Sequence, residues 1–183
     1  MRDNGQDSDD IDLLSRTAQG DMDAMKAVYQ RHAEAVQRFV YTRLNDKFEV
    51  SDIVHNTMLD VWRNAGRFQA RSSARSWILS IARNKLVDFI RKSARTELAE
   101  PDAEAPDDSP NAEMVISAAQ DASRVRECVD KLPKQQRSAV HLAFFEDLTY
   151  GEIAEVSDVP EGTIKTRIYH AKKLLMRCLS AFR

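Results

Sequence analysis

An acidic stretch with three prolines divides this chain and limits what each part can fold into. Residues 96–113, TELAEPDAEAPDDSPNAE, contain seven Asp or Glu, three Pro and no Lys or Arg. Such a segment buries too little apolar surface to offset the entropy cost of ordering it, so we expect an extended or disordered linker. The sequence on either side is long enough for one small domain with its own modest core. We therefore expect a first domain at residues 1–95, an acidic linker at 96–120 and a second domain at 121–183.

The charges are segregated in the same way. Residues 1–95 hold 16 Lys or Arg against 13 Asp or Glu, residues 96–120 hold none against seven, and residues 121–183 hold 11 against nine. The positive charge is concentrated, because residues 61–95 carry nine basic residues and only Asp88, and residues 161–183 carry six and only Glu161. Two basic patches with an acidic connector indicate two anion-binding lobes on a tether. The alternative is that each patch is an ordinary solvated helix face.

Helical periodicity runs through the first predicted domain. Apolar residues recur at three- and four-residue steps over residues 10–43, and Gly20-Asp21 is expected to break this stretch into two helices. A third helix is expected to begin after Ser51-Asp52 and to end at Gly66, followed by an arginine-rich loop at 67–75. A fourth helix is expected from about residue 76 to residue 92. Five Gly and five Pro in 183 residues also favour helices over a turn-rich sheet protein.

The second predicted domain is helical too and ends in a helix-turn-helix pattern. One helix ends at Pro133 and another runs through residues 139–144. Thr149 and Glu152 have the spacing of a capping box, and Pro160 suits the first position of the next helix. In that last helix Ile164, Ile168, Ala171 and Leu175 are expected to face inward. The predicted fold class is therefore all-α, with two small helical domains joined by a flexible acidic linker.

The last helix has the polar, basic outer face of a helix that reads duplex DNA. In helix-turn-helix proteins the second helix enters the major groove, with its N-terminal residues at base edges and basic side chains at phosphates. Lys165 and Thr166 are best placed for bases, and Tyr169 and His170 follow one turn later. Lys172 and Lys173 have the positions of phosphate contacts. The alternative is a charged helix packed in an ordinary bundle.

Two blocks of the sequence resemble one family of proteins. Residues 132–175 resemble region 4 of sigma factors of the extracytoplasmic-function (ECF) group, through Leu132-Pro133, the helix Glu152-Ile153-Ala154 and the recognition-helix stretch at 162–167, GTIKTR. DIVHNTMLDVWRNAGRF (52–68) resembles region 2.2 and the start of region 2.3, and WILSIARNKLVDFIRK (77–92) resembles the patterned stretch that follows in that family. The resemblance covers nearly the whole chain apart from the linker and the first few residues. It implies a sigma region 2 helical bundle and a sigma region 4 helix-turn-helix.

The resemblance implies three sets of site residues. The set for binding core RNA polymerase is Asp52, His55, Asn56, Leu59 and Asp60. The set for the −10 element, on the loop and the following helix, is Arg67, Phe68, Gln69, Arg71, Arg75, Asn84, Lys85, Arg91 and Lys92. The set for the −35 element, on the recognition helix, is Lys165, Thr166, Arg167, Tyr169, His170, Lys172 and Lys173.

This chain departs from the family pattern at two places. His55-Asn56 replaces the common Gln followed by Glu or Asp, although both residues can still form hydrogen bonds. Ser157-Asp158 replaces the apolar–Gly pair common in the turn, and Asp tolerates a left-handed backbone better than most residues, so the turn is expected to survive. Phe68 has an alternative role as a core plug, and Trp62 and Trp77 are expected to be core residues because both lie on apolar stripes.

The resemblance also implies function and partners. It predicts a sigma factor that binds core RNA polymerase and promoter DNA, that is controlled by an anti-sigma factor, and that is a monomer outside its complexes. A stand-alone helix-turn-helix regulator explains 149–175 but not 52–92, and a nucleic-acid-processing enzyme lacks any recognisable catalytic cluster. We expect no enzymatic activity, no cofactor and no metal.

Location and redox state follow from the remaining features. Without a signal peptide, or an apolar run near the ~18 residues of a membrane span, a cytoplasmic protein with no direct membrane insertion is expected. Cys128 and Cys178 lie far apart and form no CxxC motif, so a reduced pair of thiols is expected rather than a disulfide or a zinc site.

Overall fold

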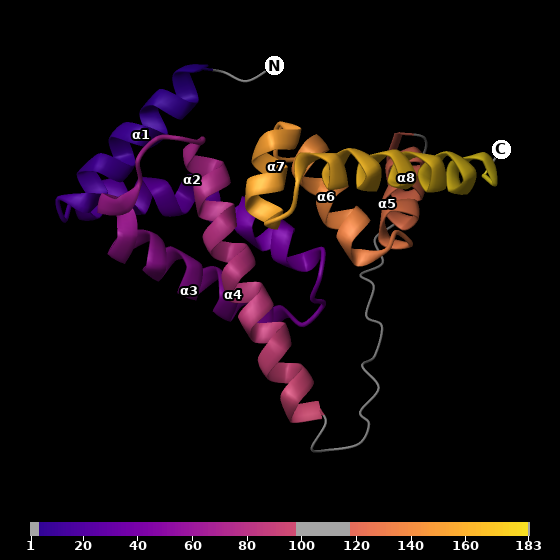
Figure 1. The fold of residues 1–183 in the computed structure, drawn as a ribbon, viewed down its shortest axis with the longest axis horizontal. Coiled ribbons are helices and arrows are strands. Elements are labelled where there is room, and N and C mark those ends of the chain that lie inside the picture. The colour runs from indigo at the N-terminus through magenta and orange to yellow at the C-terminus, as the bar shows by residue number, and fades with distance from the viewer. Residues whose placement is uncertain (1–3, 98–117, 183) are drawn as a thin grey trace.

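The computed structural model describes residues 4–97 and 118–182, and every regular element within those ranges is a helix. The first lobe contains α1 (Asn4–Ala18), α2 (Met22–Tyr41), α3 (Lys47–Asn64), the 3₁₀ turn η1 (Ala65–Arg67) and α4 (Ala74–Glu97). The second lobe contains α5 (Ala118–Asp130), α6 (Lys134–Phe144), α7 (Tyr150–Ser157) and α8 (Glu161–Ser180) (Figure 1). The all-α prediction is confirmed for these residues. Most of the predicted linker, residues 98–117, lies outside the described residues.

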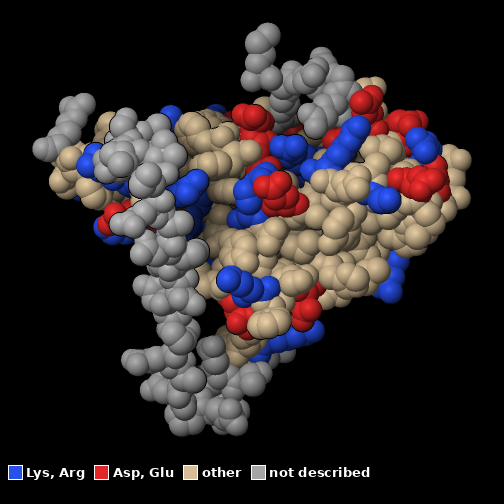
Figure 2. All heavy atoms as spheres, turned by 180° about the vertical axis from the view of Figure 1, so that it is seen from behind, with Lys and Arg blue, Asp and Glu red and all other residues tan. Residues whose placement is uncertain are grey.

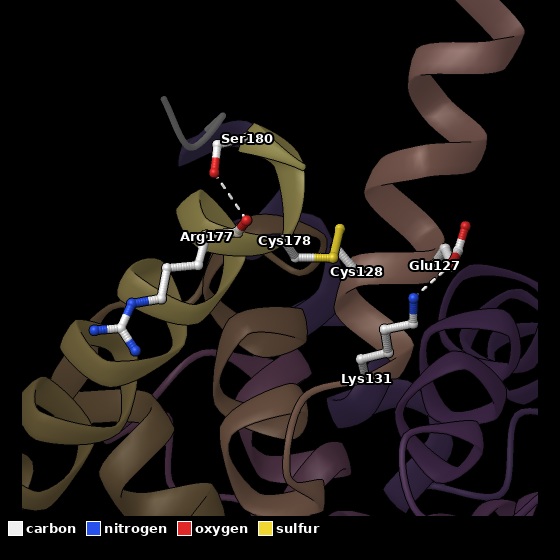
Figure 3. The surroundings of a disulfide bond; sticks show 6 residues. All are labelled: Glu127, Cys128, Lys131, Arg177, Cys178 and Ser180. Carbon is white, nitrogen blue, oxygen red and sulfur yellow. Dashed lines mark hydrogen bonds and ion pairs between the residues drawn. A yellow bond between two sulfur atoms is a disulfide. The ribbon is translucent and has the colours of Figure 1, made fainter. Parts of the chain in front are cut away.

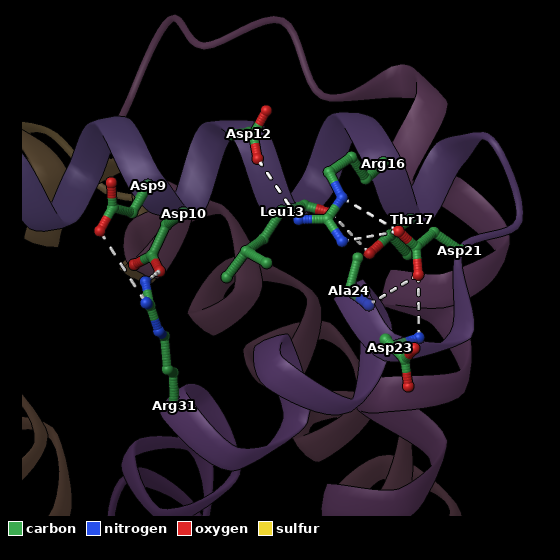
Figure 4. Close-up of polar contacts among 10 residues, drawn as sticks. All are labelled: Asp9, Asp10, Asp12, Leu13, Arg16, Thr17, Asp21, Asp23, Ala24 and Arg31. Carbon is green, nitrogen blue, oxygen red and sulfur yellow. Dashed lines mark hydrogen bonds and ion pairs between the residues drawn. The ribbon is translucent and has the colours of Figure 1, made fainter.

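The predicted break at Gly20-Asp21 is confirmed, and the local chemistry explains it. Gly20 has a φ of 89°, a left-handed conformation that suits glycine. Asp21 then caps α2, because its carboxylate accepts hydrogen bonds from the backbone N–H groups of Asp23 and Ala24 at 2.9 and 3.0 Å. Arg16 donates to the same carboxylate, at 2.8 Å from Nη2 (Figure 4). The turn between α1 and α2 is therefore held by its own side chains.

Several helix ends differ from the sequence predictions. The helix α3 begins at Lys47, four residues before Ser51, because Asp46 accepts hydrogen bonds from the N–H groups of Phe48 and Glu49 and acts as the cap. The helix α4 runs from residue 74 to residue 97, longer than predicted at both ends. Pro160 is the cap of α8 and lies just outside it. Periodicity alone located the helices but not their termini.

The first lobe closes around an apolar core to which all four helices contribute. Fully buried members include Leu14 of α1, Val36 of α2, Val61 of α3 and Leu79 of α4. A polar contact also joins α1 to α2, because Asp10 lies 2.8 Å from Arg31 Nη1 (Figure 4). Asp10 also lies 3.2 Å from His32 Nε2. Burial alone raises the pKa of Asp10, but the contacts of His32 and Arg31 outweigh it, so the pKa is lowered.

The prediction of reduced cysteines is wrong in this structure, which joins Cys128 to Cys178 as a disulfide. The bond links α5 to the C-terminal half of α8, with Cα atoms 5.8 Å apart (Figure 3). Sequence spacing could not show this, because the two residues are 50 positions apart and meet only when α5 packs against α8. Cys128 is buried, and a separate small core of Leu132, Val140 and Ala171 lies in the same lobe.

The two lobes pack directly against each other in this structure. The helix α7 lies along α4, and α6 touches α2 (Figure 1). One continuous set of buried apolar residues runs from the first lobe to Ile153, Val156 and Ile164 of the second. Polar contacts reinforce the packing, since Ser73 donates to Glu152 Oε1 at 2.6 Å and the Thr42 hydroxyl lies 2.7 Å from that of Ser138. The structure is therefore a closed arrangement of the two lobes.

Candidate nucleic-acid interface

The helix-turn-helix is built by α7, a tight turn and α8. The predicted capping box is present, because the backbone N–H of Thr149 donates to Glu152 Oε2 at 2.9 Å and the N–H of Glu152 donates to Thr149 Oγ1 at 3.3 Å. Asp158 ends α7 in the left-handed conformation, with φ 54° and ψ 51°. The turn thus survives the loss of the usual glycine, as predicted. It directs α8 away from the first lobe (Figure 1).

Six of the seven residues predicted to bind the −35 element form an exposed face of α8. They are Lys165, Thr166, Tyr169, His170, Lys172 and Lys173. Ile164, Ile168 and Ala171 are buried on the opposite side, as predicted from their spacing. The exposed face carries cations, an aromatic ring and hydroxyl groups, which suits contact with phosphates and base edges.

Five of these six side chains contact neighbours on the same lobe. The Thr166 hydroxyl donates to the Gly162 carbonyl at 3.0 Å, and Lys172 Nζ lies 5.7 Å from the centroid of the Phe144 ring. Lys165 Nζ lies 2.9 Å from the carboxylate of Glu161, and this hydrogen bond and charge raise the pKa of Lys165. The Tyr169 and His170 rings meet edge to face, with centroids 5.4 Å apart. Such contacts limit the conformations that the side chains must lose on binding.

Arg167 differs from the other six residues. It is only half exposed, and its guanidinium donates to Gln135 Oε1 on α6 at 2.8 Å. It also lines a cavity at the seam between the lobes, together with Arg43 and Arg83. In the closed arrangement Arg167 therefore faces the first lobe, apart from the exposed face of α8.

The residues predicted to bind the −10 element are spread over the loop and the whole of α4. Arg67, Gln69 and Arg71 are exposed on the loop, and Arg91 and Lys92 are exposed near the other end of the helix. Residues 75 and 91 of one helix are about 24 Å apart at 1.5 Å per residue. The set is therefore an extended track, longer than a compact pocket.

Other members of the −10 set contact neighbouring residues of the chain. Phe68 packs against Trp77 with ring centroids 5.3 Å apart and lies half-buried against the core, in agreement with the core-plug alternative. Asn84 is exposed, and its Oδ1 accepts a hydrogen bond from Arg83. Lys85 Nζ lies 2.5 Å from Asp60 Oδ2, so one residue of the −10 set is paired with one residue of the polymerase set.

Arg75 is the residue of the −10 set that the closed arrangement engages most strongly. Its guanidinium lies 3.4 Å from Glu146, in the loop after α6. The same carboxylate lies 2.9 Å from Arg38 of α2 and 3.2 Å from His141 of α6. Burial raises the pKa of Glu146, but the contacts of His141 and Arg38 outweigh it and the pKa is lowered. The sequence does not indicate a role for Glu146, because a single glutamate between Phe145 and Asp147 forms no recognisable motif.

The predicted polymerase set lies on one face of α3. Asp52, His55, Asn56 and Leu59 are exposed, and Asp60 is half-buried. Beside them is an apolar groove of about 340 Å³ to which α2 also contributes, through Met22, Met25 and Tyr29. The sequence reasoning assigned nothing on α2 to this surface. Met22 and Tyr29 lie on the apolar stripe of their helix and yet remain exposed, which only the structure could show.

Charge, metal and membrane features complete the description. On the face opposite to that of Figure 1, basic and acidic side chains intermix (Figure 2). Within residues 4–97 and 118–182, no group of three or more His, Cys, Asp or Glu side chains could hold a metal ion. None of the described helices combines the length and the apolar character needed to cross a bilayer.

Each lobe matches the model of a known protein family. Residues 28–96 match the model of Sigma-70 region 2, and residues 122–175 match the model of Sigma-70, region 4. The fold and the two matches together define a protein of the sigma-70 class.

Relatives of known name refine this class. The ECF RNA polymerase sigma factor RpoE of Cereibacter sphaeroides is 32% identical over 158 residues, which are 86% of this chain and 87% of that protein. The ECF RNA polymerase sigma factor SigK of Mycobacterium bovis is 32% identical over 177 residues, which are 94% of this chain and 95% of that protein. This chain belongs to the ECF RNA polymerase sigma factors.

Solved structures agree on the fold. The sigma factor RpoE of Bartonella quintana, solved with the anti-sigma factor NepR, superposes with a TM-score of 0.72 at 22% identity, over 86% of this chain and 98% of that chain. CnrH, solved with the cytosolic domain of CnrY, superposes with a TM-score of 0.66 at 23% identity, over 94% and 98%. At these identities the likeness concerns the fold alone.

Proposed function

We propose that this chain is a promoter-specificity subunit that binds core RNA polymerase and directs it to promoters with a −35 and a −10 element. The observation that carries this proposal is the order of the two sigma regions along the chain, with the exposed basic face of α8 in the second. A sigma factor is a transcription initiation factor, and the polymerase supplies the chemistry. We propose accordingly that this chain has no catalytic role of its own.

Region 4 would bind the −35 element as duplex. Lys165 and Thr166 lie in the first turns of α8, where a recognition helix contacts base edges. Lys172 and Lys173 lie about two turns later and would bind phosphates, a contact that weakens as salt rises. Arg167 can contact DNA only after its hydrogen bond with Gln135 breaks. We therefore propose that this bond is broken in the DNA-bound state.

Region 2 would bind the −10 element and capture unstacked bases. Arg67, Gln69 and Arg71 on the loop offer hydrogen-bond donors to base edges, and Arg91 and Lys92 would hold strand phosphates. Asn84 is exposed on α4 between these groups and offers an amide to a flipped base. Phe68 would support the loop from below through its contact with Trp77 rather than stack on a base.

The polymerase would bind the surface formed by α3 and α2. The exposed residues Asp52, His55, Asn56 and Leu59 supply polar contacts around the apolar groove that contains Met22, Met25 and Tyr29. An apolar centre with a polar rim is typical of a protein interface. We place the protein in the cytoplasm, where the polymerase acts.

An anti-sigma factor is the further partner that we propose. RpoE of Bartonella quintana was solved in complex with the anti-sigma factor NepR. Two exposed functional faces on one chain give such an inhibitor a target on each lobe. A pull-down from unstressed cells that recovers no inhibitory partner would contradict this part of the proposal.

Run-off transcription with core polymerase tests the main proposal. Protein-dependent initiation on a pool of promoter fragments is expected, and Lys165→Glu is expected to abolish it. Lys131→Glu is a matched control, because both lysines have 61% exposed side chains and pair with a glutamate four residues earlier (Figure 3 shows the Lys131–Glu127 pair). If no transcript appears and the free protein shifts duplex DNA, the stand-alone regulator is the better account.

A further inference from the structure

Three arginines from three helices or their ends converge on one cavity at the seam between the lobes. The cavity has a volume of about 190 Å³. Arg43 reaches it from the end of α2, Arg83 from α4 and Arg167 from α8. Two of these residues belong to the first lobe and one to the second, so the group forms only when the lobes are packed together. We call it the arginine cavity.

The positive charges in the arginine cavity are poorly compensated. Arg83 lies 3.5 Å from the carboxylate of Asp158, whose side chain is 80% exposed. Arg167 donates to the neutral amide oxygen of Gln135 at 2.8 Å. The guanidinium of Arg43 forms no hydrogen bond or ion pair with any residue in the described parts of the chain, although Arg43 is only half exposed. One exposed carboxylate therefore serves three guanidinium groups.

The electrostatics of Arg43 agree with this geometry. Burial lowers the pKa of Arg43, and the charges of Arg167 and Arg83 lower it further. An arginine nevertheless keeps its charge at any physiological pH. Packing the lobes thus brings three guanidinium groups together with one exposed carboxylate, and an anion in the cavity would reduce the remaining repulsion.

We propose that the arginine cavity binds a small oligophosphate, which bridges the two lobes. Guanidinium groups form paired hydrogen bonds with phosphate oxygens, and three of them around one space suit an anion with several phosphate groups. The volume admits a small molecule and excludes a protein helix or a DNA duplex.

Binding in the arginine cavity has a consequence for the whole molecule. A ligand that binds only the closed arrangement favours that arrangement by mass action. It would also hold Arg167, one of the predicted −35 residues, at the seam. This regulatory consequence rests on the proposed function, whereas the binding itself does not. A binding measurement without polymerase or DNA therefore tests the oligophosphate site alone. Its result does not depend on whether the proposed promoter-specificity function is correct.

Isothermal titration of the full chain with inorganic tripolyphosphate tests the proposal. We expect saturable binding at one site, at least about ten-fold weaker in Arg43→Gln, because a charge-assisted contact is lost. Arg63→Gln is the control, since Arg63 is an exposed arginine of α3 outside the cavity and this change removes the same charge. Its affinity is expected to equal that of the wild type.

Further arms of the same experiment distinguish the alternatives. If Arg43→Gln is poorly folded by circular dichroism, Arg43→Lys keeps the charge but not the planar fork, and is expected to bind more weakly than the wild type. Absence of saturable binding by the wild type, or equal loss in both glutamine variants, overturns the proposal. The proposal fails as well if duplex DNA of unrelated sequence binds through Arg43 while tripolyphosphate does not bind. In that case the ligand of Arg43 is the DNA backbone and not a small oligophosphate.

Discussion

The guanidinium of Arg75 lies 3.4 Å from the carboxylate of Glu146, which is completely buried in the second lobe. Arg38 of the first lobe donates to the same carboxylate at 2.9 Å from Nη2 and 3.1 Å from Nε. One buried acid thus joins the lobes through two arginines, and one of these is a residue predicted to bind the −10 element. Arg75 can reach DNA only if this contact breaks. We therefore expect lobe packing and promoter binding to compete.

Glu146→Gln is expected to loosen the closed arrangement. The change leaves Arg38 and Arg75 without their charge partner at the seam. Loss of one member of a buried pair costs about 3–5 kcal/mol, and the partial exposure of the two arginines makes the cost smaller here. The lobes also share buried apolar residues such as Ile153 and Val156, so the change is expected to raise the fraction of open molecules rather than to separate the lobes completely. Fluorescence transfer between dyes on α1 and α8, or the radius of gyration from X-ray scattering, measures the opening.

Glu34→Gln is the matched control for this experiment. Glu34 pairs with the same Arg38 at 2.7 Å, but its side chain is 76% exposed and lies on the same helix. An exposed pair of this kind contributes about 0–1 kcal/mol. Equal opening in both variants would show that the Glu146 contact does not hold the lobes together.

The closed arrangement is expected to weaken in acid. The pKa of Glu146 is lowered in the closed state, so its carboxylate stabilises packing fully above the ordinary pKa of a glutamate. That contribution is lost as the pH falls from the ordinary pKa of a glutamate through the lowered value. His141, Arg38 and Arg75 face the carboxylate, and the guanidinium groups of Arg38 and Arg75 repel each other once it is protonated.

Interlobe fluorescence transfer measured against pH checks this expectation. Asp10 also has a lowered pKa, but it pairs with Arg31 and His32 inside the first lobe. The Glu146→Gln variant separates the two effects, because it retains the Asp10 cluster and lacks the titrating group at the seam. An acid transition in lobe distance that persists unchanged in this variant would assign the effect to another group.

The sequence predicted the elements of the fold better than their assembly. The break at Gly20, the capping box of Thr149 and Glu152 and the left-handed turn at Asp158 depend on neighbouring residues, and all three are present. The start of α3 was wrong, because Asp46 competes with Ser51 as a cap and only backbone geometry decides between them.

The sequence predicted the exposure of candidate site residues only where that exposure depends on the spacing within a single helix. The spacing of Ile164, Ile168 and Ala171 alone fixed which side of α8 is exposed. Contacts over long sequence distances gave no signal. Arg75 and Glu146 are 71 positions apart, and Arg38 and Glu146 are 108 positions apart. Arg167 was assigned to DNA from its motif, and its turn towards Gln135 depends on α6, which no motif describes.

Reduction of the disulfide is expected to destabilise the second lobe. The bond closes a loop across 50 positions of sequence between α5 and α8. Constraining the unfolded chain in this way contributes about 2–4 kcal/mol. Dithiothreitol should therefore lower the free energy of unfolding measured by urea denaturation, and a thiol count on the unfolded protein should rise from none to two.

Cys178→Ser provides the control for that measurement. The variant should be less stable than the oxidised wild type by a similar amount, and dithiothreitol should change its stability no further. A reducing agent that destabilises the variant as much as the wild type would show that the effect does not come from the Cys128–Cys178 bond.

The turn of the helix-turn-helix offers a test of backbone strain at one residue. Asp158 has φ 54° and ψ 51°, a conformation that glycine adopts freely and other residues adopt at a cost. Asp158→Gly and Asp158→Ala both remove the 3.5 Å contact with Arg83, so the difference between them reports the backbone alone. We expect the glycine variant to be more stable by about 1 kcal/mol in urea denaturation. Equal stabilities would mean that the turn relaxes out of the left-handed region in the alanine variant. In that case the orientation of α8 would change, and run-off transcription would fall in the alanine variant while it is retained in the glycine variant.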